Sequence, residues 1–170
     1  MVKNSHIVLI VSLLLAAILM PGCNTEHNTT QAKNGNIVQV NYTGKLADGT
    51  VFDTSVGLKP LEFTLGAGQM IPGFEKAVLG MKIGEKKTVT IPAKDAYGPR
   101  RNDLIQEIGQ EKLPSGLTPK VGLQLQMKRA DGGLSIVTIT NVSDATVTID
   151  ANHPLAGKDL TFEIELVKIQ

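Results

Sequence analysis

The stretch VNYTGKLADGTVFDTS, residues 40–55, reads as two short strands joined by a tight turn. Apolar and polar residues alternate over residues 37–43, which is the period of a strand with one buried face. Asp48-Gly49 is a strong hairpin signal, because both residue types tolerate a positive φ. We therefore expect a return strand over residues 51–54 that pairs with the first.

The remaining pattern outside one internal segment predicts a small α+β domain. Short strands are expected over residues 62–65 and 86–91, and a last strand over residues 160–166, where apolar and polar residues again alternate. Residues 72–80 read as one short helix, because Pro suits its first turn and Gly its C-terminal end. Apolar residues at i, i+3 and i+4 from Phe74 give this helix one apolar face. We expect a twisted antiparallel sheet wrapped on this one short α-helix.

The internal segment, residues 100–152, reads as a small, mostly-β inserted domain. It contains no aromatic residue, and turn formers stand at both of its ends. Alternating apolar residues predict strands over residues 123–128, 135–142 and 146–149. Apolar residues between 104 and 117 either pack the core of this module or form an exposed groove for client chains, and the sequence leaves both readings open.

The N-terminus reads as an export signal. Lys3 precedes an apolar run over residues 7–20, which suits a secretory signal and is short for a transmembrane helix. Cys23, the only cysteine, follows at once, in a position similar to that of the lipidated cysteine of a bacterial lipoprotein. A plain signal peptide with an incidental cysteine is the alternative. We expect a signal peptide over residues 1–22, lipidation at Cys23 and a flexible polar tether over residues 23–35. The protein would then be extracytoplasmic and membrane-anchored, at the periplasmic face or the cell surface.

Several function classes find no support. The formal net charge is +1 and no basic stripe is visible, so no nucleic-acid partner is expected. His153 is the only histidine in the expected folded part, and one histidine without a cluster of cysteines or acids predicts no metal site. The chain also lacks the Gly-x-Ser-x-Gly motif of serine hydrolases.

The aromatic residues are distributed in an unusual way. All six lie outside the insertion, one in each expected element: Tyr42, Phe52, Phe63, Phe74, Tyr97 and Phe162. Aromatic residues of a small domain usually form its core, and Phe63 and Phe74 could do only that. Tyr97 differs, because it stands in a loop sequence, where a tyrosine hydroxyl often contacts a ligand. A sheet wrapped on one helix could gather these rings into a single apolar cleft.

These motifs, in this order, resemble the FK506-binding protein family of peptidyl-prolyl isomerases. They are VNYTG (40–44), DGTVFDTS (48–55), FTLG (63–66), IPGFE (71–75), AYG (96–98) and LTFE (160–163). The insertion follows the AYG loop, which resembles the SlyD-like branch, whose inserted domain binds unfolded chains. The resemblance implies an isomerase domain made of residues 36–99 and 153–170, and a chaperone-like insertion over residues 100–152. Many SlyD-type proteins end in a His- and Cys-rich metal-binding tail; the residues after the expected last strand are not of this kind, so nickel handling is not expected here.

The resemblance also implies site residues and partners. Tyr42, Phe52, Asp53 and Tyr97 would be catalytic, and no cofactor would be needed. Substrate-binding residues would be Leu61, Phe63, Met70, Ile71, Phe74 and Phe162. The Ile71 N–H and the Tyr97 hydroxyl would bond substrate carbonyls, and Asp53 would accept a hydrogen bond from Tyr42, unless it only caps the turn after its strand.

The expected partners are unfolded or partly folded proteins with X–Pro bonds, and FK506-like macrolides are candidate ligands. Many relatives carry Trp where Phe74 stands, so a deeper pocket and weaker macrolide binding are expected here. We expect a monomer. A non-catalytic holdase chaperone is the alternative function.

Overall fold

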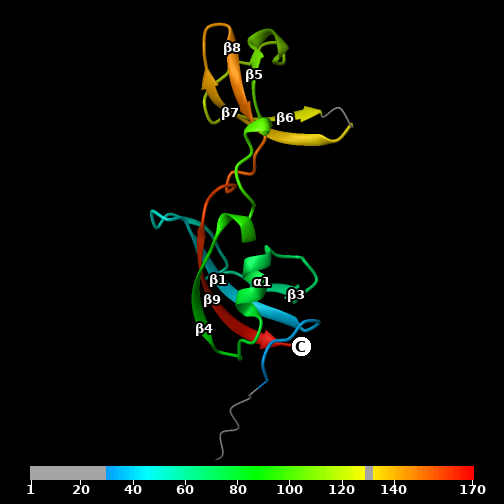
Figure 1. Ribbon diagram of the computed structural model, residues 1–170, viewed down its shortest axis with the longest axis vertical. Helices are drawn as coiled ribbons and strands as arrows, with labels where there is room; N and C mark the ends of the chain where they lie inside the picture. The colour runs from blue at the N-terminus through cyan, green and yellow to red at the C-terminus, as the bar shows by residue number, and fades with distance from the viewer. Residues whose placement is uncertain (1–29, 129–131) are drawn as a thin grey trace, which may run out of the picture.

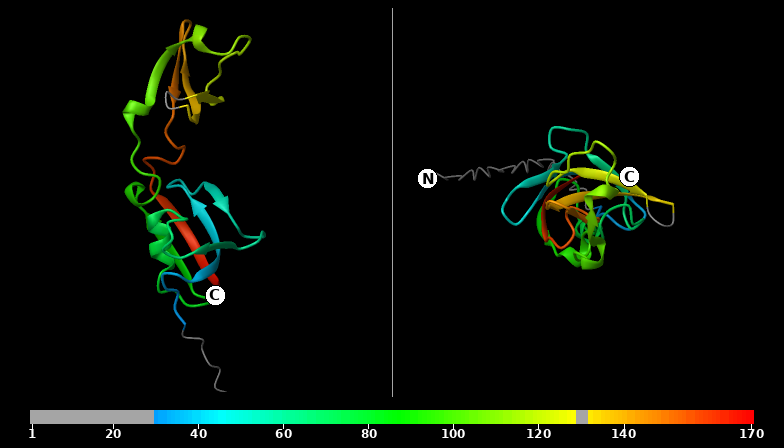
Figure 2. Two further views of the ribbon diagram at one scale, coloured as in Figure 1. Left: turned by 90° about the vertical axis from the view of Figure 1, so that its right-hand side faces the viewer. Right: turned by 90° about the horizontal axis from the view of Figure 1, so that it is seen from above.

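Two antiparallel β-sheets make up the chain in the computed structural model, which describes residues 30–128 and 132–170 (Figure 1). The expected signal peptide, Cys23 and the first part of the tether lie outside the described residues. None of the helices in the described part has the length and apolar character that a membrane crossing requires. The two sheets lie one beyond the other along the long axis, joined by two connecting segments (Figure 2).

The first sheet has the order β2-β1-β9-β4, and β3 also pairs with β1. Its strands are β1 (Ile37–Lys45), β2 (Val51–Thr54), β3 (Leu61–Thr64), β4 (Lys86–Ile91) and β9 (Leu160–Ile169). The β1–β2 hairpin turns at Gly49, whose φ of 84° is the positive value that the Asp-Gly signal predicts. β9 thus lies between β1 and β4, and it returns to this sheet after the chain has formed the second sheet.

A β-bulge near the end of β9 interrupts the alternation of apolar and polar residues along this strand. Val40 pairs with Leu166, whereas Gln39 pairs with Lys168, so Val167 is an extra residue without a partner on β1. Because of this extra residue, the side chain of Ile169 again lies on the inner face of the sheet, where it packs against the core.

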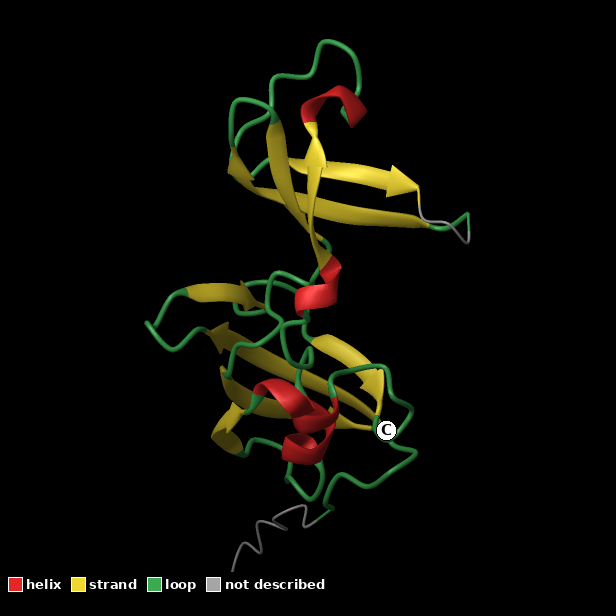
Figure 3. Cartoon of the chain, turned by 45° about the horizontal axis from the view of Figure 1, so that its top comes forward, coloured by secondary structure: helices red, strands yellow, loops and turns green. Residues whose placement is uncertain are grey.

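The α-helix α1 (Pro72–Val78), the only one among residues 30–128 and 132–170, covers one face of this sheet (Figure 3). Pro72 stands in its first turn, and Gly80 just beyond its end has a φ of 81°. Phe74, Ala77 and Val78 are buried against the sheet, as the spacing predicts. The fold is therefore the expected twisted antiparallel sheet on one short helix.

Residues 31 and 32 pair with the segment that follows α1. Ala32 is only 1% exposed, its N–H donates to the carbonyl of Met81 at 2.8 Å, and its own carbonyl accepts from Gly80 N–H. Gln31 forms an isolated bridge with Lys82. Pairing with residues 80–82 thus includes residues 31 and 32 in the fold, within the stretch that the sequence predicts as the tether.

The second sheet has the order β5-β8-β7-β6. Its strands are β5 (Ile105–Gly109), β6 (Gln124–Lys128), β7 (Leu134–Val142) and β8 (Thr146–Asp150). Val137, Ile139, Val147 and Ile149 form a core of its own, separate from that of the first sheet. Ile108 and Leu113, from the stretch that the sequence left open, pack against this core.

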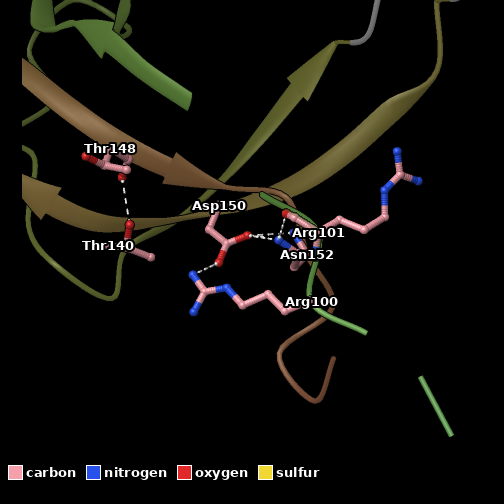
Figure 4. Close-up of polar contacts among 6 residues, drawn as sticks. All are labelled: Arg100, Arg101, Thr140, Thr148, Asp150 and Asn152. Atoms are coloured by element: carbon pink, nitrogen blue, oxygen red, sulfur yellow. Dashed lines mark hydrogen bonds and ion pairs between the residues drawn. The ribbon is translucent and has the colours of Figure 1, made fainter. Parts of the chain in front are cut away.

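Polar contacts tie together the two segments that join the sheets (Figure 4). Asp150 accepts from the Arg100 guanidinium at 2.5 Å and from the Asn152 side chain at 2.7 Å. Asn152 in turn accepts from the Arg101 N–H and donates to the Arg101 carbonyl, both at 2.8 Å. The outgoing and the returning segment are therefore fixed to each other beside the second sheet.

Candidate active site

A pocket of about 330 Å³ opens over the aromatic side of the first sheet. Its walls come from β1, β2, β9, the start of α1 and the loop after β4. The lining residues are Tyr42, Phe52, Asp53, Gln69, Met70, Ile71, Phe74, Tyr97 and Phe162. The structure thus brings eight of the ten residues expected to be catalytic or substrate-binding into one hollow.

Phe74 forms the floor of this pocket. Its side chain is fully buried, and its ring meets Tyr42 edge to face at 5.8 Å and Phe162 at 5.2 Å. Phe52 meets Phe162 in the same way at 5.7 Å. Edge-to-face packing is a favourable arrangement of aromatic rings, so each ring fixes the orientation of the next. The result is a rigid apolar surface.

Gly44 on β1 makes this packing possible. A Cβ at this position would lie 2.6 Å from Cζ of Phe52, which is too close for any contact, and 3.0 Å from Cε1 of Phe162, which is tighter than an ordinary contact. The absent side chain leaves room for both rings on the sheet. A glycine within a strand is a sequence signal for close approach, and it could have identified this position.

The polar edge of the pocket is a hydrogen bond between two of its lining residues. The Tyr42 hydroxyl donates to Oδ2 of Asp53 at 2.5 Å, and Oδ1 of Asp53 accepts from the Thr54 N–H at 2.9 Å. Asp53 therefore accepts the hydrogen bond expected from Tyr42, and its second oxygen binds the backbone of its own strand. Burial and the hydrogen bond to Asp53 raise the pKa of Tyr42 to about 12, so its hydroxyl keeps its proton.

The backbone around this pair is also fixed. Ser55 is the buried polar residue of the region, and its Oγ accepts from the Tyr42 N–H at 2.9 Å. The Tyr42 carbonyl accepts from the Ser55 N–H and from the Thr54 hydroxyl, both at 3.0 Å. These bonds hold the end of β2 against β1, so the distance from Tyr42 to Asp53 does not depend on the exposed loop that follows.

Two further lining residues, Ile71 and Tyr97, carry hydrogen-bond donors. Within residues 30–128 and 132–170, neither the Ile71 N–H nor the Tyr97 hydroxyl donates a hydrogen bond. The Met70 N–H just before is bound by Oε1 of Glu75 at 3.2 Å, which fixes the loop that presents Ile71. Donors without partners at the rim of a pocket are available to the carbonyl groups of a peptide.

Two expected substrate-binding residues do not line the pocket. Phe63 is 5% exposed and lies behind Phe74, with ring centroids 6.0 Å apart, so it supports the floor instead of forming it. Leu61 lines a neighbouring hollow of about 360 Å³, which shares Tyr42 and Asp53 with the aromatic pocket. Strand alternation places both side chains on the inner face of the sheet, but it does not reveal what covers them.

Gln69 lines the pocket and has no counterpart among the expected residues. Its Oε1 accepts from the Thr64 N–H at 2.7 Å, which fixes its amide beside Met70. Nothing in the sequence distinguishes this glutamine from an ordinary loop residue. In the described part of the chain, no group of three His, Cys, Asp or Glu residues is arranged to hold a metal ion.

The comparisons with known proteins agree with this geometry. The family model of the FKBP-type peptidyl-prolyl cis-trans isomerase matches residues 28–167. The chain is 39% identical over 153 residues to the short-type peptidyl-prolyl cis-trans isomerase of Methanocaldococcus jannaschii, with 81% of this chain and 94% of that protein covered. It is 35% identical over 134 residues to the FKBP-type peptidyl-prolyl cis-trans isomerase SlyD of Treponema pallidum, with 79% and 76% covered. For SlyD of Escherichia coli the identity is 34% over 134 residues, with 79% and 68% covered.

Proposed function

The chain belongs to the FKBP-type peptidyl-prolyl cis-trans isomerases, and we propose that it rotates X–Pro bonds of extracytoplasmic proteins in its aromatic pocket. Its homologues include SlyD proteins, and we propose that the second sheet binds the client chain during this reaction. The observation that carries the proposal is a fixed apolar pocket with one carboxylate at its edge and two lining donors that have no partner among the residues that the structure describes.

The reaction needs no nucleophile, because no covalent bond breaks. Uncatalysed X–Pro exchange takes tens to hundreds of seconds, which is slow enough to limit folding. The barrier to peptide rotation, about 18–20 kcal/mol, comes from amide resonance, which places negative charge on the oxygen. Water stabilises this planar form, whereas the twisted form has lost much of the charge separation. A pocket that excludes water therefore favours the twisted form, which is the transition state.

The lining residues divide this task. The prolyl ring would lie on Phe74 between Phe52 and Phe162, where it displaces water from the apolar surface. The Ile71 N–H and the Tyr97 hydroxyl would hold the substrate carbonyls on either side of the rotating bond. Each ~1.36 kcal/mol by which these contacts favour the twisted form accelerates rotation tenfold.

Asp53 would act at the edge of the pocket, next to the rotating amide. Its Oδ2 is held by the Tyr42 hydroxyl and its Oδ1 by a backbone N–H, so the charge has a fixed position. A fixed charge costs no reorganisation when the amide dipole changes during rotation. Asp53 thereby favours one orientation of the twisted amide.

Exposed apolar side chains support client binding by the second sheet. Leu134 and Ile136 on β7 are 60% and 65% exposed, and Val121 near the start of β6 is 67% exposed. Apolar residues that remain exposed beside a separate core are typical of surfaces that bind other chains. The occupants would be unfolded or partly folded segments, which offer apolar side chains that a folded protein buries.

The proposed location rests on the order of Lys3, the apolar run and Cys23. A lipid on Cys23 would anchor the protein outside the cytoplasm, at the periplasmic face or the cell surface. The variant Cys23→Ser should move the protein from the membrane fraction to the soluble fraction of the cells. A wild-type protein that is already soluble would favour the plain signal peptide.

The catalytic proposal is tested with a proline-containing peptide, in an assay that uses no protease. The wild-type protein should accelerate cis–trans exchange, and Phe52→Ala should lower kcat/KM while the circular dichroism spectrum is retained. A folded wild-type protein without activity would refute the proposed function. If such a protein still suppressed aggregation of an unfolded client, the holdase alternative would replace it.

The client-binding proposal needs a separate test on the full chain. We expect the double variant Leu134→Ser and Ile136→Ser to keep full activity on a short peptide and to lose activity on a refolding protein that is limited by a prolyl bond. The matched control is Val51→Ser, which changes an exposed valine on the first sheet. Equal activity of both variants on the refolding protein would contradict client binding by this face.

A further inference from the structure

The ring of His153 lies flat on the ring of Tyr97. Their centroids are 3.9 Å apart and the two planes differ by 3°. Tyr97 belongs to the loop after β4 and lines the aromatic pocket, whereas His153 belongs to the segment that returns from the second sheet. The stack therefore connects the pocket to the segment that returns from the second sheet, although 55 residues of the chain separate Tyr97 from His153.

His153 is itself held in place. Its Nδ1 accepts from the Leu155 N–H at 3.1 Å, and its carbonyl accepts from the Ala156 N–H at 2.9 Å. The residue that follows is Pro154, and a proline restricts the backbone of the residue before it to extended conformations. These contacts fix the orientation of the imidazole independently of Tyr97.

Tyr97 has no comparable support of its own. Its side chain is 41% exposed, and its hydroxyl makes no hydrogen bond within the part of the chain that the structure describes. An exposed tyrosine on a loop would otherwise sample several rotamers, and fixing one of them on substrate binding costs conformational entropy. A ring stacked on its face removes most of that freedom in advance.

The backbone reinforces the same junction. The Gly157 N–H donates to the carbonyl of Gly98, the residue after Tyr97, at 2.8 Å. A Cβ on Gly157 would lie 3.1 Å from Cβ of Arg100, so a glycine allows the two segments to approach this closely. The loop of Tyr97 and the turn of His153 are thus also joined through their backbones.

We propose that His153 is a positioning residue, which holds the Tyr97 ring over the pocket so that its hydroxyl meets a substrate carbonyl. The inference rests on the proposed use of this pocket for X–Pro rotation. Because His153 follows Asp150 and Asn152, whose contacts fix the connecting segments (Figure 4), a shift of the second sheet would reach Tyr97 through the stack.

The test combines peptide isomerase kinetics with proton NMR of the full chain. His153→Ala should lower kcat/KM about threefold to tenfold, the range expected for one aromatic pair. The Tyr97 ring protons should also lose the upfield shift that a stacked imidazole causes. His153→Phe keeps a ring but loses Nδ1, and it should restore most of the activity and the shift. Methyl signals of Ile164 and Leu166 report that the core remains folded.

A double-variant cycle decides whether His153 acts through Tyr97. In a Tyr97→Ala background, His153→Ala should cause no further loss of kcat/KM. An equal loss in both backgrounds would overturn the proposal, and so would an unchanged Tyr97 spectrum in His153→Ala. An inactive wild-type protein would instead refute the proposed function, whereas an active one with an unaltered His153→Ala variant overturns this inference alone.

Discussion

The Tyr42 hydroxyl donates a 2.5 Å hydrogen bond to Oδ2 of Asp53, from the middle of β1 to the far strand of the same hairpin. The bond joins the aromatic floor to the carboxylate, because the Tyr42 ring also packs on Phe74. It therefore fixes the position of a charge relative to an apolar surface, and the first two predictions below test this bond.

The carboxylate and its donor should have separable effects on activity. Asp53→Ala should lower kcat/KM on a proline peptide about tenfold or more, because it removes the fixed charge that favours one orientation of the twisted amide, and ~1.36 kcal/mol of that preference is tenfold in rate. Tyr42→Phe keeps the ring and the apolar wall, so its loss should be smaller. A Tyr42→Phe variant less active than Asp53→Ala would contradict the assigned roles.

The raised pKa of Tyr42 predicts a loss of stability at alkaline pH. Folding raises this pKa from its ordinary value of 10.0 to about 12, so the folded state holds the proton more tightly than the unfolded state does. The contribution is complete below pH 10 and is lost as pH rises through about 12. In urea unfolding, the wild-type protein should lose stability relative to Tyr42→Phe in this window. A difference between the two proteins that does not change with pH would contradict the assignment.

Gly44→Ala should destabilise the protein through the two rings that its Cβ would meet. The backbone of Gly44 does not have a positive φ, so the effect is one of packing. We expect a loss of about 1–3 kcal/mol in the free energy of unfolding, as for other overpacked cores. A second substitution, Phe52→Leu, makes room and should recover part of the loss. Equal losses with and without Phe52→Leu would show that the rings are not the cause.

Phe74→Trp should change macrolide binding and stability in opposite directions. The larger ring fills the floor of the pocket, so we expect tighter binding of an FK506-like macrolide in a competition assay. Since Phe74 is fully buried among other rings, the same change should cost about 1–3 kcal/mol in the free energy of unfolding. Weaker macrolide binding by a folded Phe74→Trp protein would contradict the expected deeper pocket.

The contacts of Asp150 should keep the connecting segments together. Partial burial by itself would raise the pKa of Asp150, but hydrogen bonds from Asn152 and the charge of Arg100 outweigh it and lower the pKa. In Asp150→Ala, hydrogen exchange of the Arg101 and Asn152 backbone N–H groups should accelerate about fivefold to tenfold, because one partly exposed ionic contact is worth about 1 kcal/mol.

Acid should weaken the same contacts in the wild-type protein. A carboxylate with a lowered pKa contributes stability that is present above its ordinary value of 3.8 and is lost as pH falls below it. Corrected for intrinsic exchange, the two N–H groups should approach the protection of Asp150→Ala in this range. Unchanged protection in the variant at neutral pH would contradict the role of Asp150.

Local patterns in the sequence predict most of the first sheet correctly. β2 and β4 have the expected bounds, and β1, β3 and α1 differ from theirs by one or two residues. β5 was not predicted, because its sequence, IQEIG, shows no alternation of apolar and polar residues and ends in glycine. It is a strand because β8 offers it an edge to pair with.

Strand period, turn chemistry and helix ends act over a few residues, so the sequence by itself determined the elements of the first sheet and the gathering of most aromatic rings on one side. Only the tertiary structure decided which rings form the pocket. Phe63 and Phe74 are both buried, but Phe74 alone faces the hollow. The tertiary structure also decided that His153 lies on Tyr97. Contacts of this kind depend on how distant segments pack, and no local pattern encodes the position of a partner 56 residues away.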